Sequence, residues 1–207
     1  MSKFQKSAIV LGAICLVFRI VGLLMDHLLG SVSYTELTPS DFAPIIIEFA
    51  PYFIANTCFV LFLLFNALHH KSTAAKTAAI IGGVFWILLI SYYILCIIQT
   101  YCDCNGGYSP YYIFTIRNVL SIFLEALIII SIGFFADSNR KNKVVLISSI
   151  VGIGVLFLCN LYWWVIWPHF PNIISSATPE INITTSLLHL LAMSSLILCA
   201  ATVKSKK

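Results

Sequence analysis

Five ionisable side chains lie within long apolar stretches of this 207-residue chain. On insertion scales, a charged group at the centre of a membrane helix costs about 2.5–3.5 kcal/mol, so such groups usually face the protein interior and one another. Their chemistry would be ion pairing, binding of a small solute or cation, or proton exchange. Together with one serine and one histidine, the candidate residues for a buried network or a substrate- or ion-binding site are Arg19, Asp26, Glu48, Arg117, Ser121, Glu125 and His189.

The spacing of these residues places several of them on shared helix faces. Asp26 follows Arg19 by seven residues, which is about two helical turns. Ser121 and Glu125 follow Arg117 at positions i+4 and i+8. Each set therefore forms a polar stripe along one side of its helix.

The network contains three acids and two bases. From their depths along the helices, we expect Arg19 to pair with Glu125, and Arg117 to pair with Glu48 or Asp26. One carboxylate is then left over, and it is able to hold a proton, bind a cation or take part in a proton-coupled cycle. The alternative is that the ion pairs only lock the helices together. The expected neutral neighbours are Asn56, Asn160 and His189.

Signatures of catalysis are scarce in the sequence. It contains no H-E-x-x-H, no G-x-S-x-G and no Walker or dinucleotide-binding glycine pattern, so we expect no enzyme activity, no catalytic residue and no cofactor. The segment Cys102-Asp-Cys104 lacks the C-x-x-C spacing of zinc and redox sites, so we also expect no metal. A metal site completed by His169 and an intramembrane enzyme are the alternatives.

The composition indicates that membrane helices position these residues. Hydrophobic residues make up 60% of the chain and charged residues 10%, and the mean hydropathy is +0.97. Such values are typical of a polytopic membrane protein. At about 20 residues per span, little of the chain remains for a soluble domain, so the lipid bilayer is an expected partner and nucleic acid is not. The apolar runs predict an all-α fold with six transmembrane helices near 7–29, 44–68, 77–99, 111–135, 144–167 and 183–203.

Charge alternates along the connections between these helices. Ten of the twelve Lys and Arg residues fall in four polar stretches, at both ends of the chain and after the second and fourth predicted helices. The positive-inside bias therefore predicts a multi-pass protein of the cell membrane with both termini in the cytoplasm.

The predicted helices form three hairpins in a single domain, 1–207. Glycines at positions 12, 82 and 152 recur every 70 residues, which allows a three-fold hairpin repeat of about 1–71, 72–141 and 142–207. The period also follows simply from three hairpins crossing one bilayer.

These features favour small-solute or ion binding and transport, or the role of a membrane substrate-binding subunit in a transporter. In size and topology the chain resembles the substrate-binding subunits of energy-coupling-factor vitamin importers, although no motif carries that likeness. The alternative is a non-catalytic accessory, sensory or immunity-type membrane subunit, whose buried ion pairs only fix helix packing. In either case, another membrane subunit is a candidate partner.

Overall fold

The chain folds into long helices. The computed structural model describes residues 2–29, 42–104, 111–162 and 178–202, and within these ranges almost every residue is helical and none is in a β-strand. The all-α prediction is therefore confirmed. The helices are α1 (Lys3–Leu29), α2 (Phe42–His70), α3 (Thr73–Cys104), α4 (Tyr111–Ser138), α5 (Lys143–Leu161) and α8 (Thr178–Thr202).

Five of these helices are long and apolar enough to cross a membrane. The spanning segments are Lys3–Met25, Phe49–His70, Thr73–Gln99, Thr115–Ser138 and Lys143–Leu161, and α8 contributes a shorter apolar segment, Leu187–Ala201. Large apolar side chains cover the outside of the bundle: Leu68, Ile80 and Leu158 are 63%, 66% and 63% exposed. Apolar surface on this scale suits contact with lipid rather than with water. These observations support a helical, multi-pass membrane protein.

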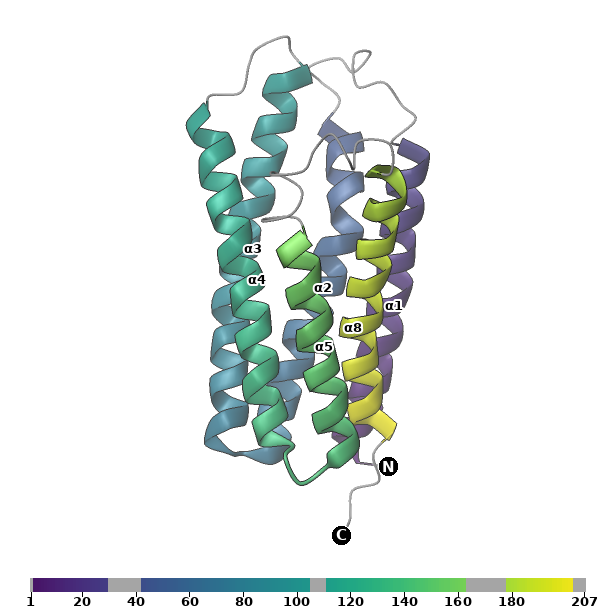
Figure 1. Ribbon diagram of the computed structural model, residues 1–207, viewed down its shortest axis with the longest axis vertical. Coiled ribbons are helices and arrows are strands. Elements are labelled where there is room, and N and C mark those ends of the chain that lie inside the picture. The colour runs from purple at the N-terminus through teal and green to yellow at the C-terminus, as the bar shows by residue number, and fades with distance from the viewer. Residues whose placement is uncertain (1, 30–41, 105–110, 163–177, 203–207) are drawn as a thin grey trace.

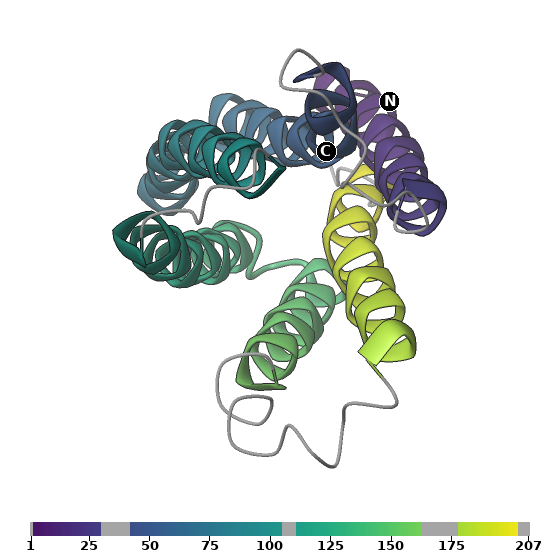
Figure 2. The same ribbon diagram turned by 90° about the horizontal axis from the view of Figure 1, so that it is seen from above.

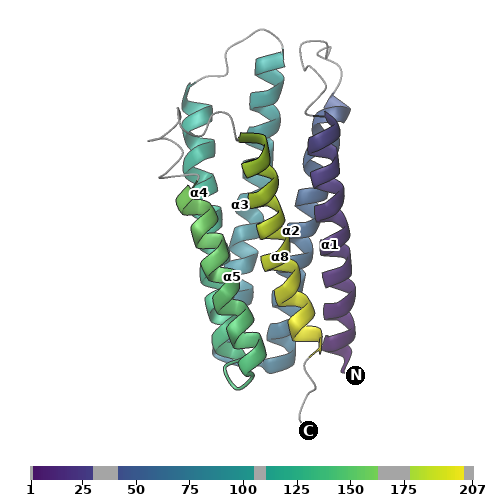
Figure 3. The ribbon, with the colours of Figure 1, turned by 45° about the vertical axis from the view of Figure 1, so that its right-hand side comes forward.

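The helices form a closed ring in the order in which they occur in the chain. Each packs against the next, and α8 packs against both α5 and α1 (Figure 2). Consequently α1 and α4 lie across the ring from each other. Figures 1 and 3 show that α1 begins and α8 ends at the same end of the bundle.

We call this end the basic end, because it carries Lys3, Lys6, Lys71, Lys76, Arg140, Lys141 and Lys143. Local hydrogen bonds define the helix starts there. The Ser2 backbone N–H donates to Gln5 Oε1 at 2.9 Å, and the Gln5 N–H donates to Ser2 Oγ at 3.2 Å, which is a reciprocal cap on α1. Ser72 accepts from the N–H of Ala75 at the start of α3, and Asn142 caps α5.

A close-packed apolar core fills the half of the ring nearer the basic end. Its side chains Phe59, Phe62, Phe85, Phe135 and Leu196 are almost completely buried. The rings of Phe62 on α2 and Phe135 on α4 lie 5.0 Å apart. Because a protein interior packed in this way contains few voids larger than water, this layer closes the ring on that side.

Several helix boundaries differ from the prediction. α3 continues to Cys104, since its last polar turn keeps the helical backbone pattern beyond the apolar run. α8 begins at Thr178, and the Thr178-Pro179 pair suits a first helical turn because proline there loses no hydrogen bond. α5 ends at Leu161, and residues 163–167 of the predicted helix lie outside the described residues.

Candidate functional site

Each of the six described helices contributes one polar side chain to a set of interacting residues inside the ring, which we call the polar belt. At a rise of 1.5 Å per residue, these side chains lie about 20–30 Å from the basic end along their helices. They therefore sit on the far side of the apolar core. The belt consists of Arg19 (α1), Asn56 (α2), Tyr93 (α3), Glu125 (α4), Asn160 (α5) and His189 (α8).

Arg19 is held on the α1–α2 side of the belt. Its Nη2 donates to Asn56 Oδ1 at 2.8 Å, and its Cζ lies 5.5 Å from the ring centroid of Tyr52, which is cation–π geometry. Asn56 is only 7% exposed and also interacts electrostatically with Tyr93 of α3. Among the described residues, nothing accepts a hydrogen bond from the buried Nε of Arg19.

A glycine allows Tyr52 to reach Arg19. A Cβ atom on Gly22 would lie 2.8 Å from Cζ of the Tyr52 ring, closer than any van der Waals contact. Gly22 lies three residues after Arg19 on α1, so the missing side chain makes room for the ring beside the guanidinium. The position of the cation is therefore set by the packing of α1 against α2.

Glu125 is held on the opposite side of the ring. Asn160 Nδ2 donates to the Leu156 carbonyl at 2.8 Å and reaches Glu125 Oε2 at 3.3 Å. His189 lies close enough to interact electrostatically with both Glu125 and Arg19. The histidine thus interacts with both charged residues of the belt.

The two charges do not form the ion pair expected from the sequence. Among the described side chains, Arg19 bonds to Asn56 instead, and no salt bridge joins it to Glu125. The physical reason is the order of helices around the ring. α1 and α4 lie opposite each other, whereas Asn56 lies on α2 next to α1, and Asn160 lies on α5 next to α4. Arg19 therefore keeps a buried N–H, at Nε, without a hydrogen-bond partner among the described residues.

The two other residues of the α4 stripe, Arg117 and Ser121, form hydrogen bonds with Asn118 of the same helix. Ser121 Oγ donates to the Asn118 carbonyl at 2.9 Å, and Arg117 Nη2 lies 3.4 Å from Asn118 Oδ1. Arg117 is also close enough to Tyr92 for electrostatic interaction. The side chains of Asp26 and Glu48 lie outside the described residues, so their pairing with Arg117 stays a prediction.

Two aromatic members of the site were not predicted from the sequence. Tyr52 precedes Asn56 by four residues, and this i, i+4 spacing places the two side chains on the same face of α2. The spacing could therefore have indicated Tyr52 as a neighbour of Arg19. Tyr93 belongs to a group of tyrosines that is equally compatible with the membrane interface. For the alternative metal site, Cys104 and His169 fall outside the described side chains, and elsewhere no group of three or more His, Cys, Asp or Glu side chains could hold a metal ion.

The chain matches no family model, no curated protein and no solved structure. The chemistry of the polar belt therefore has to be inferred from its own residues.

Proposed function

We propose that this protein binds a small solute inside the ring, with an anionic group at Arg19 and a cationic or donor group at Glu125, and that it serves as a transporter or as the solute-binding membrane subunit of one. One observation carries the proposal: two opposite charges on facing helices lie at one level without an ion pair between them. A solute with one negative and one positive group would pair with Arg19 and Glu125 at the same time.

The chemistry on each side of the belt supports this class of solute. The buried N–H at Nε of Arg19 is a donor for a carboxylate, and charge-assisted bonds of this kind are short and strong. Across the ring, Asn160 donates through Nδ2 and so presents Oδ1 as an acceptor beside the Glu125 carboxylate. Two acceptors suit an ammonium group. The solute class is therefore small and zwitterionic, as in a free amino acid.

The same geometry supports an orientation in the membrane. The positive-inside bias places the basic end in the cytoplasm. The apolar core then closes the site toward the cytoplasm, and the polar belt lies in the outer half of the membrane. We propose entry from the outer side of a cell membrane, with both termini in the cytoplasm.

A second candidate function has its own observation. The hydrogen bonds Arg19–Asn56 and Asn160–Glu125 each join neighbouring helices, as expected of an accessory membrane subunit whose polar groups only fix packing. In that case the belt would add stability without binding a solute.

Thermal unfolding of the detergent-solubilised protein separates the two functions. Amino acids would be compared with monocarboxylates, monoamines and inorganic cations, each at saturating concentration. A solute at a hundred times its Kd stabilises by about 2.7 kcal/mol, which is readily measured as a rise in Tm. We expect stabilisation by bipolar solutes and a much weaker effect of solutes with one charge.

The decisive variant is Glu125→Gln, which keeps an acceptor for Asn160 but removes the charge. Its matched control is Asp137→Asn, the same change on the same helix at the basic end. Glu125→Gln should abolish solute-dependent stabilisation, and Asp137→Asn should retain it. If no bipolar solute stabilises the protein, or both variants respond alike, the accessory function is the correct one.

A further inference from the structure

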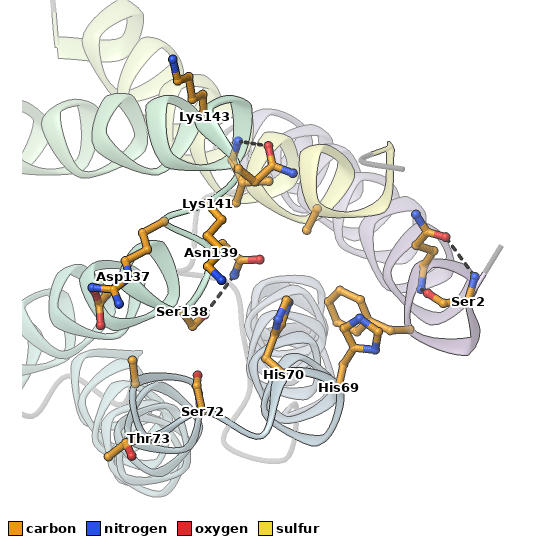
Figure 4. A pocket seen from close by; sticks show the side chains of 17 residues that line it. Ser2, His69, His70, Ser72, Thr73, Asp137, Ser138, Asn139, Lys141 and Lys143 are labelled. Carbon is orange, nitrogen blue, oxygen red and sulfur yellow. Dashed lines mark hydrogen bonds between the residues drawn. The ribbon is translucent and has the colours of Figure 1, made fainter. Parts of the chain in front are cut away.

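A second polar site lies at the basic end, far from the polar belt. A cavity of about 790 Å³ opens between the start of α1, the α2–α3 turn, the α4–α5 turn and the end of α8. Figure 4 shows His69 and His70 of α2 on one side of it and the turn bearing Asn139 and Lys141 on the other. The cavity therefore gathers groups from helices distant in sequence.

The lining of this cavity is strongly cationic. Arg140, Lys141 and Lys143 contribute three positive charges, and Asp137 is the one acidic residue among the described lining residues. Ser72, Thr73 and the two imidazoles add uncharged hydrogen-bonding groups to the lining. Four other basic residues of the same end, Lys3, Lys6, Lys71 and Lys76, are not among the residues that line it. Membrane orientation alone requires basic residues at this end, but does not require three of them to lie in the lining of one cavity.

Buried hydrogen bonds hold the cationic turn in place. Asn66 is fully buried on α2, and its Nδ2 donates to Ser138 Oγ at 3.2 Å. Asn139 Nδ2 lies 2.9 Å from Ser138 Oγ, 3.0 Å from the Phe135 carbonyl oxygen and 3.4 Å from Asn66 Oδ1. These bonds tie the end of α4 to α2, so Arg140 and Lys141 start from a fixed backbone. A preorganised set of donors binds a ligand at a lower entropic cost.

The opposite wall is equally well defined. The ring of Phe4 stacks on His69 with centroids 4.9 Å apart and planes 10° from parallel, and it meets His70 edge-on at 6.2 Å. His70 also interacts electrostatically with Asn139 of the α4–α5 turn. Phe4, Val145 and Ala200 give the cavity an apolar side beneath its polar rim. A ligand with a compact anionic head and an apolar or neutral body matches this division.

We propose that the cavity at the basic end binds a phosphate group, from either an anionic phospholipid headgroup or a soluble phosphate ester. Arg140 and Lys141 would contact the phosphate oxygens, with His70 and Ser72 as neighbouring donors. Guanidinium and ammonium groups are the usual partners of phosphate, and Arg binds it through two parallel bonds. The proposal is independent of solute binding at the polar belt.

The test measures lipid and phosphate binding in detergent, where membrane orientation plays no part. Native mass spectrometry would compare retention of phosphatidylglycerol and phosphatidylcholine, and thermal unfolding would be followed with glycerol 3-phosphate and inorganic phosphate. The variant is Arg140→Gln with Lys141→Gln. Its matched control is Lys6→Gln with Lys76→Gln, which removes the same charge from the same end.

Loss of two charge-assisted contacts should lower the affinity of the cavity variant about tenfold or more and leave the control near the wild type. If the wild type retains phosphatidylglycerol and the cavity variant does not, the ligand is a lipid. If glycerol 3-phosphate stabilises the wild type but not the cavity variant, the ligand is a soluble ester. Equal losses in the two double variants would overturn the proposal. The proposal would also be overturned if the wild-type protein showed no preference for phosphatidylglycerol over phosphatidylcholine and no stabilisation by glycerol 3-phosphate or inorganic phosphate. This measurement on the wild type decides the question even if the cavity variant does not fold.

Discussion

Two glycine substitutions give a direct measure of the contact that positions Arg19. In Gly22→Ala, the new Cβ would lie 2.8, 3.0 and 3.1 Å from three atoms of the Tyr52 ring, whereas a Cβ on Gly83 would meet nothing within 4 Å. Both changes replace a glycine inside a helix with alanine, which favours the helix by about 0.5–1 kcal/mol. Only Gly22→Ala adds an overpacking cost, typically about 1–3 kcal/mol. The difference between the two variants therefore isolates the contact.

Reversible unfolding in mixed micelles would supply the two free energies. We expect Gly83→Ala to be slightly more stable than the wild type, and Gly22→Ala to be less stable than Gly83→Ala by about 1–3 kcal/mol. In a Tyr52→Ala background the clash disappears, so Gly22→Ala should then behave like Gly83→Ala. Solute-dependent stabilisation should also fall in Gly22→Ala, because the displaced ring no longer packs against the guanidinium. Equal stability of the two single variants would refute the α1–α2 packing described above.

Three further substitutions test other parts of the bundle by the same unfolding measurement. Asn66→Ala removes the buried amide that joins α2 to Ser138 on α4, and it should destabilise the protein by about 1–3 kcal/mol, whereas no loss would show that this link is dispensable. Asn142→Ala removes the cap of α5 and should cost about 1 kcal/mol, with Asn142→Ser close to the wild type; an equal cost for both would argue against capping. Thr57→Val removes the acceptor of the Trp86 indole N–H at 3.0 Å, so its cost should shrink by about 0.5–1.5 kcal/mol in a Trp86→Phe background, and an unchanged cost would exclude the bond.

The sequence predicted the helices better than their ends. Apolar runs locate the parts of a helix that contact lipid or core, which is why α2 and α4 begin within two residues of the predicted positions 44 and 111. Helices also continue through polar turns, as α3 does to Cys104, because the backbone hydrogen-bond pattern does not depend on hydropathy. For this reason boundaries set by composition stop short.

Of the seven candidate residues, Arg19, Glu125 and His189 lie in the polar belt, but the expected pairing of Arg19 with Glu125 is wrong. Spacing and depth were enough to select Arg19 and Glu125, because a charge inside an apolar run stands out. Which helices are neighbours depends on the order and rotation of helices around the ring, and neither is encoded in a local period. The hydrogen bond from Arg19 to Asn56 and its contact with Tyr52 therefore depend on how α1 and α2 pack in the folded bundle.

The closure of the ring by α8 against α1 has a consequence for how the protein is made. Five of the described helices precede α8 in the chain, so until α8 is synthesised the flank of α1 that it covers lacks this neighbour. That flank includes Gly12, where a Cβ would lie 3.0 Å from both Ile197 and Leu198 of α8. The contact between α1 and α8 can form only once α8 has been made, and His189 joins the polar belt only at that moment. Assembly of the interior thus depends on α8.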